Sequence, residues 1–244
     1  MKDNKKPIIA WFSCGATSAI ATMFALREYS NVIIYRIITG SEHPDNERFM
    51  QDCEDKLFHQ KVTIARSTKY ANVTDVIMKK RFINSPFGAS CTFELKKQVR
   101  YKIEDEIQCW EGQIYGFDTT ERKRAQRFIE QYPATKPLFP LIDHNLSKED
   151  CLAVIANHGI KLPAMYQLGY NNNNCIGCVK GGKGYWNMIR KDFPEIFKQM
   201  SNIERQIGHS CIKDCFLDEL PITSGRTPGV IPECSIFCAL EFMD

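Results

Sequence analysis

The sequence predicts an α/β protein built on a doubly wound, mostly parallel sheet, and three observations predict this class. Short apolar runs rich in β-branched residues alternate with longer segments of helical periodicity. Small residues follow the first apolar run, as they do where a parallel strand turns into its helix. The chain has 244 residues, of which 43% are hydrophobic and 25% charged, so it can bury the core that such a sheet needs.

The predicted elements follow one another in β–α order. Five apolar residues over Ile8–Phe12 predict a buried strand. Ile20, Met23 and Phe24 have the i, i+3, i+4 spacing that predicts a helix over 16–28. The next elements are expected to be a strand over 32–38, a helix over 45–59, and strands over 62–65 and 113–115.

A later helix is marked at both of its ends. Ser147 and Asp150 have the spacing of a capping box, and Gly159 is placed to end the helix. Beyond it, the composition changes to cysteine, glycine and aromatic residues. We therefore expect an α/β domain over 1–170 and a cysteine-rich C-terminal region over 171–244 that packs on the same domain.

The N-terminal stretch and the clustered cysteines, which suit a reducing compartment, indicate a cytoplasmic protein, whereas the charge balance decides nothing. A net charge of +3, from 32 basic and 29 acidic residues, is too even to predict a nucleic acid partner by itself. Lys5 and Lys6 precede an uncharged stretch over 7–26, as in a secretory signal, but its continuous apolar core covers only 8–12. A membrane span needs about 20 apolar residues, so no membrane contact is expected.

The turn after the first strand combines small residues with hydroxyl groups. Such a turn either cradles phosphate with its backbone N–H groups and the following helix N-terminus, or is an ordinary tight turn. Thr39 and Gly40, at the end of the second strand, are expected to face the same crevice. Cys14 is either an inert thiol or one that the helix N-terminus activates. The candidate phosphate-binding residues of this turn are Ser13, Cys14, Gly15, Ala16, Thr17 and Ser18.

The chain contains eleven cysteines, many of which lie in its last third. These late cysteines are Cys175, Cys178, Cys211, Cys215, Cys234 and Cys238. The spacing of Cys175 and Cys178 suits a metal, an iron–sulfur cluster or a redox pair. With Cys234 and Cys238 as the remaining ligands, we expect a [4Fe–4S] cluster, with zinc as the alternative. Cys211 and Cys215 either join the ligand set or are packed in the core.

Three motifs in order resemble the phosphoadenosine phosphosulfate reductase family of the PP-loop, or adenine nucleotide α-hydrolase, superfamily. Ser-x-Gly-x-x-Ser begins at Ser13, and Thr-Gly-x-x-x-Pro-Asp-x-x-x-Phe begins at Thr39. Gly-x-x-x-x-Glu-x-x-Arg places Gly116 beside the nucleotide, with Glu121 and Arg124 as candidate catalytic residues. The resemblance covers roughly residues 7–180. It implies a Rossmann-like fold that binds phosphoadenosine phosphosulfate, adenosine phosphosulfate or ATP.

The same resemblance implies roles for two further cysteines. Cys234 follows Glu233, as the catalytic cysteine does in the mobile tail of these reductases, so it is either the nucleophile or a cluster ligand. In the adenylylsulfate-reducing branch, an upstream Cys-Cys pair joins a later CxxC on a [4Fe–4S] cluster. Ser90-Cys91, followed by Lys96, is similar in place, so Cys91 is an alternative ligand.

The leading functional hypothesis is a sulfonucleotide reductase-like oxidoreductase in which a thiolate attacks the sulfuryl group and a thioredoxin-like protein donates electrons. Thr17 stands where ATP-cleaving relatives carry an acidic residue, and this favours an already activated nucleotide. The alternatives are an ATP-dependent iron–sulfur sulfurtransferase that modifies tRNA or DNA, and a non-catalytic nucleotide- or cluster-binding regulator. A homodimer is an option that the sequence leaves open.

Overall fold

The computed structural model, which describes residues 5–85 and 88–226, contains a five-stranded parallel sheet. The strand order is β3-β2-β1-β6-β7, and every neighbouring pair runs parallel. The strands are β1 (Ile8–Trp11), β2 (Val32–Ile38), β3 (Thr63–Arg66), β6 (Gly112–Ile114) and β7 (Pro137–Leu138). The α/β class with a mostly parallel sheet is therefore confirmed, and the four predicted strands occur within one residue of their expected bounds.

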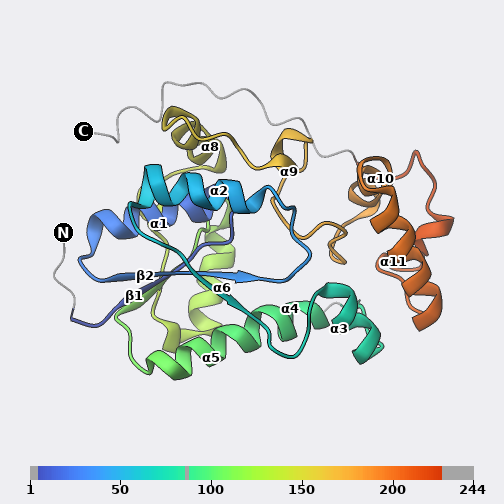
Figure 1. Ribbon diagram of the computed structural model, residues 1–244, viewed down its shortest axis with the longest axis horizontal. Helices are drawn as coiled ribbons and strands as arrows, with labels where there is room; N and C mark the ends of the chain where they lie inside the picture. The colour runs from blue at the N-terminus through green and yellow to red at the C-terminus, as the bar shows by residue number, and fades with distance from the viewer. Residues whose placement is uncertain (1–4, 86–87, 227–244) are drawn as a thin grey trace.

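Helices cover both faces of this sheet. Figure 1 shows α1 (Ala16–Glu28), α2 (Asn46–Cys53) and α8 (Lys148–Asn157) on one side of β1 and β2, with α5 (Gln98–Ile107) on the other. The helix expected over 45–59 is α2 continued by a π-helical turn over Glu54–Phe58. Right-handed crossovers from β1 to β2 and from β2 to β3 place α1 and α2 on the same face.

The helix predicted from the capping box begins and ends as expected. The Ser147 side chain accepts the N–H of Asp150, and the Asp150 carboxylate accepts the N–H of Ser147 at 2.8 Å. The helix ends at Asn157, and Gly159 adopts φ +63°, a conformation that glycine tolerates best. The short helices α7 (Pro140–Asp143) and α9 (Ala164–Gln167) flank it in sequence.

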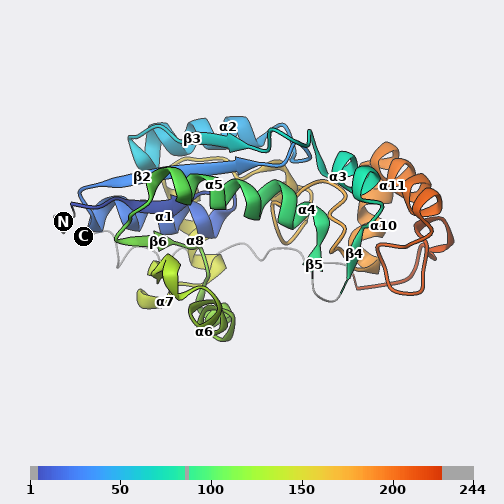
Figure 2. The same ribbon diagram turned by 90° about the horizontal axis from the view of Figure 1, so that it is seen from below.

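The chain has a second apolar core at one end of the sheet. Figure 2 shows α10 (Lys183–Asp192) and α11 (Pro194–Ile207) beside α3 (Val73–Lys80) and the hairpin of β4 (Asn84–Ser85) and β5 (Gly88–Ala89). Residues from both sides of position 170 fill this core. Its largest fully buried side chains are Trp186, Tyr170, Ile77, Ile83 and Leu95.

The sequence did not indicate the helices α3, α5 and α11, nor several short elements. The hairpin β4–β5 has two residues in each strand, too few for a periodicity to show. The remaining elements are α4 (Ser90–Thr92), a π-helical turn over Phe93–Lys97 and α6 (Arg122–Gln131), with 3-10 turns at Thr119–Glu121, Pro133–Thr135 and Leu217–Glu219. No helix among the described residues is long and apolar enough to span a bilayer.

Candidate functional site

The order of the strands places a crevice beside the end of β1. The chain passes from β1 to β2 and β3 on one side and returns to β6 on the other, so the carboxyl ends of β1 and β6 flank a switch point where α/β proteins bind ligands. Gly116 follows β6 and lies against the start of α1. A Cβ atom on Gly116 would lie 2.6 Å from the Ser18 backbone nitrogen, so only glycine permits this approach.

Ser18 holds the turn between β1 and α1 in shape. Its Oγ accepts hydrogen bonds from the Ser13 N–H and the Ser13 hydroxyl, each at 3.1 Å, and donates to the Gly15 carbonyl at 2.9 Å. Cys14 adopts φ +59°, and the Asn173 amide donates to its carbonyl at 2.7 Å. The turn is therefore held both by its own hydroxyls and by the distant segment that carries Asn173.

The N-terminus of α1 presents backbone donors to this turn. The Ala16 N–H donates to the Tyr166 hydroxyl at 3.3 Å. In the part of the chain that the structure describes, no protein acceptor bonds the N–H groups of Gly15 or Thr17. Because these donors lie at the positive end of a 13-residue helix, the turn can bind an anion such as phosphate.

Cys14 is buried within the turn. Its Sγ lies 3.7 Å from the Asn46 carbonyl oxygen. Burial raises the pKa of the Cys14 thiol to about 12, with Arg36 opposing the shift. Burial therefore favours the inert alternative for Cys14 over activation by the helix N-terminus.

A cavity of about 220 Å³ opens beside Ser13. The Gln113 Oε1 atom accepts hydrogen bonds from two of the residues that line it, the Trp11 indole at 2.8 Å and the Tyr115 hydroxyl at 2.7 Å. The Nε of Arg100 is buried and lies 3.3 Å from the Glu104 carboxylate, with which it forms an ion pair. The lining combines four aromatic rings with three cationic side chains: Trp11, Phe12, Ser13, Tyr35, Ile37, Lys96, Lys97, Arg100 and Tyr115. An aromatic base and an anionic group are the ligands that this combination suits.

The end of β2 joins this crevice to the cysteine-rich part of the chain. The Thr39 hydroxyl donates to Glu42 at 2.7 Å, and its Oγ1 lies 3.0 Å from the Cys175 Sγ. Gly40 adopts φ +71°, and a Cβ there would lie 2.2 Å from the Ala71 carbonyl oxygen. Thr39 therefore lies in close contact with the segment that carries Cys175, and Gly40 lies in close contact with the backbone at Ala71.

The CxxC segment is fixed at its backbone. The Tyr185 hydroxyl accepts the Cys178 N–H at 2.8 Å and donates to the Cys175 carbonyl at 3.0 Å. Burial raises the pKa of the Cys175 thiol to about 11, against the opposing attraction of the Lys96 ammonium. Lys96 also lines the cavity beside Ser13, so one cation faces both the cavity and the cysteine.

Four further predicted residues do not join the contact between Thr39 and Cys175. Glu121 and Arg124 form an ion pair with each other, and the Arg124 guanidinium stacks on Phe117 at 4.2 Å. The Arg124 side chain is 61% exposed, and neither residue lines the cavity beside Ser13. Cys234 and Cys238 lie outside the described residues, so their predicted roles stay predictions.

Sequence reasoning missed several residues of the site. Lys97 and Arg100 line the cavity, and Asn173 holds the turn, yet none of the three belongs to a motif. The run Asn171–Asn174 indicated only a polar loop. The clustering of the basic residues Lys96, Lys97 and Arg100 is the one sequence signal that could have identified the cavity lining.

No family model matches the chain. An uncharacterized protein of Methanocaldococcus jannaschii is 21% identical to it over 208 residues, which cover 83% of this chain and 42% of that protein. A protein described as an uncharacterized 37.8 kDa protein in the gpa 5′ region of Escherichia phage 186 is 28% identical over 145 residues, which cover 55% of this chain and 42% of the relative. The matched region thus spans about two-fifths of each of these curated relatives.

Proposed function

We propose that the chain is an adenine-nucleotide-binding enzyme of sulfur chemistry, of the sulfonucleotide reductase-like type. The observation that carries the proposal is the 3.0 Å contact between Thr39 and Cys175, which joins the nucleotide crevice to the cysteines. An enzyme that moves sulfur from an adenine nucleotide to a thiol needs these two parts side by side. The motifs at Ser13 and Thr39 support the same class.

Different residues of the crevice bind the phosphates, the base and the sulfuryl group of the nucleotide. The phosphate groups lie over the N-terminus of α1, where Gly15 and Thr17 present their N–H groups. The base stacks in the cavity against Trp11 or Tyr35. Lys96 faces the sulfuryl group from the cysteine side and stabilises the negative charge on its oxygens.

The reaction that this arrangement supports has two balanced steps. A cysteine thiolate attacks the sulfuryl sulfur, an S–S bond forms, and the S–O bond to the nucleotide breaks with its electron pair going to the phosphate oxygen. A dithiol protein of the thioredoxin class then attacks the cysteine sulfur and releases sulfite, and its own two thiols close to a disulfide. Cys234 is the nucleophile that the sequence predicts for the first step.

The test measures nucleotide binding and sulfite release on the full chain, purified without oxygen and supplied with a thioredoxin. Lys96→Gln is expected to weaken sulfonucleotide binding by about tenfold, the loss of one charge-assisted hydrogen bond. Lys102→Gln is the matched control, because Lys102 lies on the same helical segment with its side chain 70% exposed and outside the cavity. Equal affinity of both variants, or no sulfite from wild-type protein, would overturn the reductase proposal.

A second candidate, sulfur transfer to a nucleic acid, is favoured by a basic and aromatic surface. The loop after β3 lines two adjoining cavities of about 640 and 450 Å³ with Arg66 and Lys69. Lys102 and Phe93 line the second of these cavities, and Phe93 is 46% exposed. Exposed rings among cations suit single-stranded nucleic acid. ATP consumption that requires added tRNA and is lost in Arg66→Ala/Lys69→Ala supports this candidate, whereas sulfite release in the absence of tRNA supports the first.

A further inference from the structure

A buried glutamine bonds two of the residues that line the cavity beside Ser13. Gln113 is the middle residue of β6, between two neighbouring strands, and its side chain is fully buried. A polar side chain in such a place is costly unless its hydrogen-bonding groups have partners. The partners of Gln113 are Glu104 on α5 and the two lining residues, Trp11 and Tyr115.

These partners fix the orientation of the Gln113 side-chain amide. The Glu104 carboxylate can only accept a hydrogen bond, and it lies 2.8 Å from the Gln113 Nε2 atom, so the amide nitrogen faces Glu104. The Trp11 indole N–H can only donate, and it lies 2.8 Å from the Gln113 Oε1 atom. Both ends of the amide are therefore assigned by their partners, and Oε1 is an acceptor for every group that bonds it.

The bond between Tyr115 and Gln113 then has one possible direction. Burial raises the pKa of the Tyr115 hydroxyl to about 12, so it keeps its hydrogen, which it donates to the Gln113 Oε1 atom at 2.7 Å. The Trp11 N–H is taken by the same Oε1 atom, and the neighbouring Thr135 hydroxyl donates to the Tyr132 carbonyl at 2.7 Å. The Tyr115 oxygen therefore presents an acceptor to the cavity that it lines.

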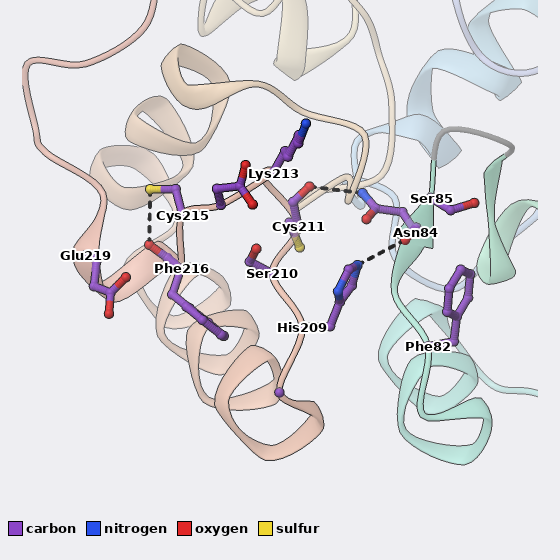
Figure 3. Close-up of a pocket in the computed structure, with 12 residues that line it drawn as sticks. Phe82, Asn84, Ser85, His209, Ser210, Cys211, Lys213, Cys215, Phe216 and Glu219 are labelled. Carbon is purple, nitrogen blue, oxygen red and sulfur yellow. Dashed lines mark hydrogen bonds between the residues drawn. The ribbon is translucent and has the colours of Figure 1, made fainter.

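A larger cavity of about 760 Å³, beside the second core, uses its polar side chains differently (Figure 3). The Asn84 side-chain amide donates to the Val179 carbonyl at 2.6 Å and to the Cys211 carbonyl at 3.0 Å. The His209 Nε2 atom lies 3.2 Å from the Asn84 backbone carbonyl oxygen. These side chains bond backbone carbonyls and hold distant segments together, whereas Tyr115 retains an acceptor for a ligand.

We propose that Tyr115 selects the base of the bound nucleotide by accepting a hydrogen bond from its exocyclic amino group. The inference rests on the proposed function and deepens it, because it names the residue that distinguishes one base from another. A base without the amino group leaves the Tyr115 oxygen unpaired, which costs binding free energy. Gln113 and Glu104 are positioning residues, because they orient the hydroxyl and neither lines the cavity.

The test compares the affinities of the full chain for adenosine monophosphate and for purine riboside monophosphate, which lacks the amino group. Wild type is expected to bind the adenosine nucleotide about tenfold more tightly, the contribution of one hydrogen bond. Tyr115→Phe should bind the two nucleotides with equal affinity, because it keeps the ring and removes the acceptor. Gln113→Met should also lose the preference, because it keeps the Tyr115 hydroxyl but removes the group that orients it. A merely structural role of Gln113 would weaken both affinities alike.

Tyr132→Phe is the matched control and should keep the wild-type preference. Tyr132 packs on the same Phe128 ring as Tyr115 and does not line the cavity. A preference that persists in Tyr115→Phe, or equal affinities in wild type, would overturn the inference and leave the proposed function standing. A full preference in folded Gln113→Met would refute its positioning role, and if that variant does not fold, Tyr115→Phe decides alone. Failure of wild type to bind either nucleotide would refute the proposed function and the inference with it.

Discussion

The Oγ1 atom of Thr39 lies 3.0 Å from the Sγ atom of Cys175, although 136 residues separate them in sequence. Thr39 directly follows β2 beside the proposed nucleotide crevice, and Cys175 begins the CxxC segment. The contact therefore connects the two chemistries that the proposed function combines.

A double-mutant cycle measures this contact. Thr39→Val and Cys175→Ala are expected to show a coupling of about 0.5–1.5 kcal/mol in the free energy of unfolding, because each removes one partner of the same hydrogen bond. The measurement is urea unfolding of metal-free protein. Thr39→Val combined with Cys109→Ala is the control, because Cys109 is exposed, and these two changes should add. Additivity in the first pair would contradict the contact.

Substitution of Gly116 tests the approach of β6 to the start of α1. Gly116→Ala is expected to destabilise the fold by about 1–3 kcal/mol, because its Cβ would meet backbone atoms that cannot move aside independently. Nucleotide binding should weaken as well, since the turn at Ser18 is displaced. Gly182→Ala is the control, because a Cβ there meets nothing within 4 Å. Thermal unfolding and nucleotide titration of both variants check this expectation, and an unchanged Gly116→Ala protein would refute it.

Alkylation tests the assignment of Cys14 as an inert thiol. Iodoacetamide at pH 8 is expected to modify the exposed Cys109 rapidly and to leave Cys14 unmodified, because burial raises the pKa of Cys14 to about 12 and blocks access. Peptide mass spectrometry of folded protein gives the extent of modification at each position. Denatured protein should be labelled at both. Rapid labelling of Cys14 in the folded state would show that the turn opens.

Asp45 makes stability depend on acid pH. The Arg48 guanidinium bonds the Asp45 carboxylate at 2.7 Å, and this bond, together with the Ala164 N–H, lowers the pKa of Asp45 below its usual value. The stabilisation is complete above the unfolded-state pKa of about 3.9 and is lost as pH falls through the lower folded-state value.

Wild type and Asp45→Asn provide the measurement. The difference between their free energies of unfolding should be constant from about pH 7 to 5 and should shrink below about pH 4. Denaturant unfolding at each pH gives the two curves. A difference that persists undiminished at about pH 3 would mean that the carboxylate charge contributes nothing.

The sequence indicated the sheet well where local signals are strong. Apolar runs at Ile8 and Val32 mark β1 and β2, and the capping box at Ser147 marks the start of α8. The hairpin at Asn84 carries no such signal, because its strands have two residues each. Its importance comes from the bonds that Asn84 makes to distant segments.

Part of the candidate site could also be predicted, because its motifs are local in the sequence. Motifs identified the turn at Ser13 and the CxxC at Cys175, since each lies within a few consecutive residues. The neighbourhood of Cys211 depends on how α11 packs against α3, which no spacing in the sequence encodes. Arg100 enters the cavity through the placement of a whole helix, and a linear pattern does not show that either.

Asn173 holds the carbonyl of Cys14, and Asn174 alone separates it from Cys175. A ligand that displaces the turn at Cys14 therefore also shifts the segment that positions the Cys175 thiol. Thermodynamic linkage makes such an effect reciprocal: if the nucleotide alters the affinity of Cys175 for iron or electrons, the oxidation state or metal load of Cys175 alters the affinity for the nucleotide by the same factor. Under the proposed function, the loop that carries Asn173 would couple nucleotide binding to the state of the Cys175 thiol.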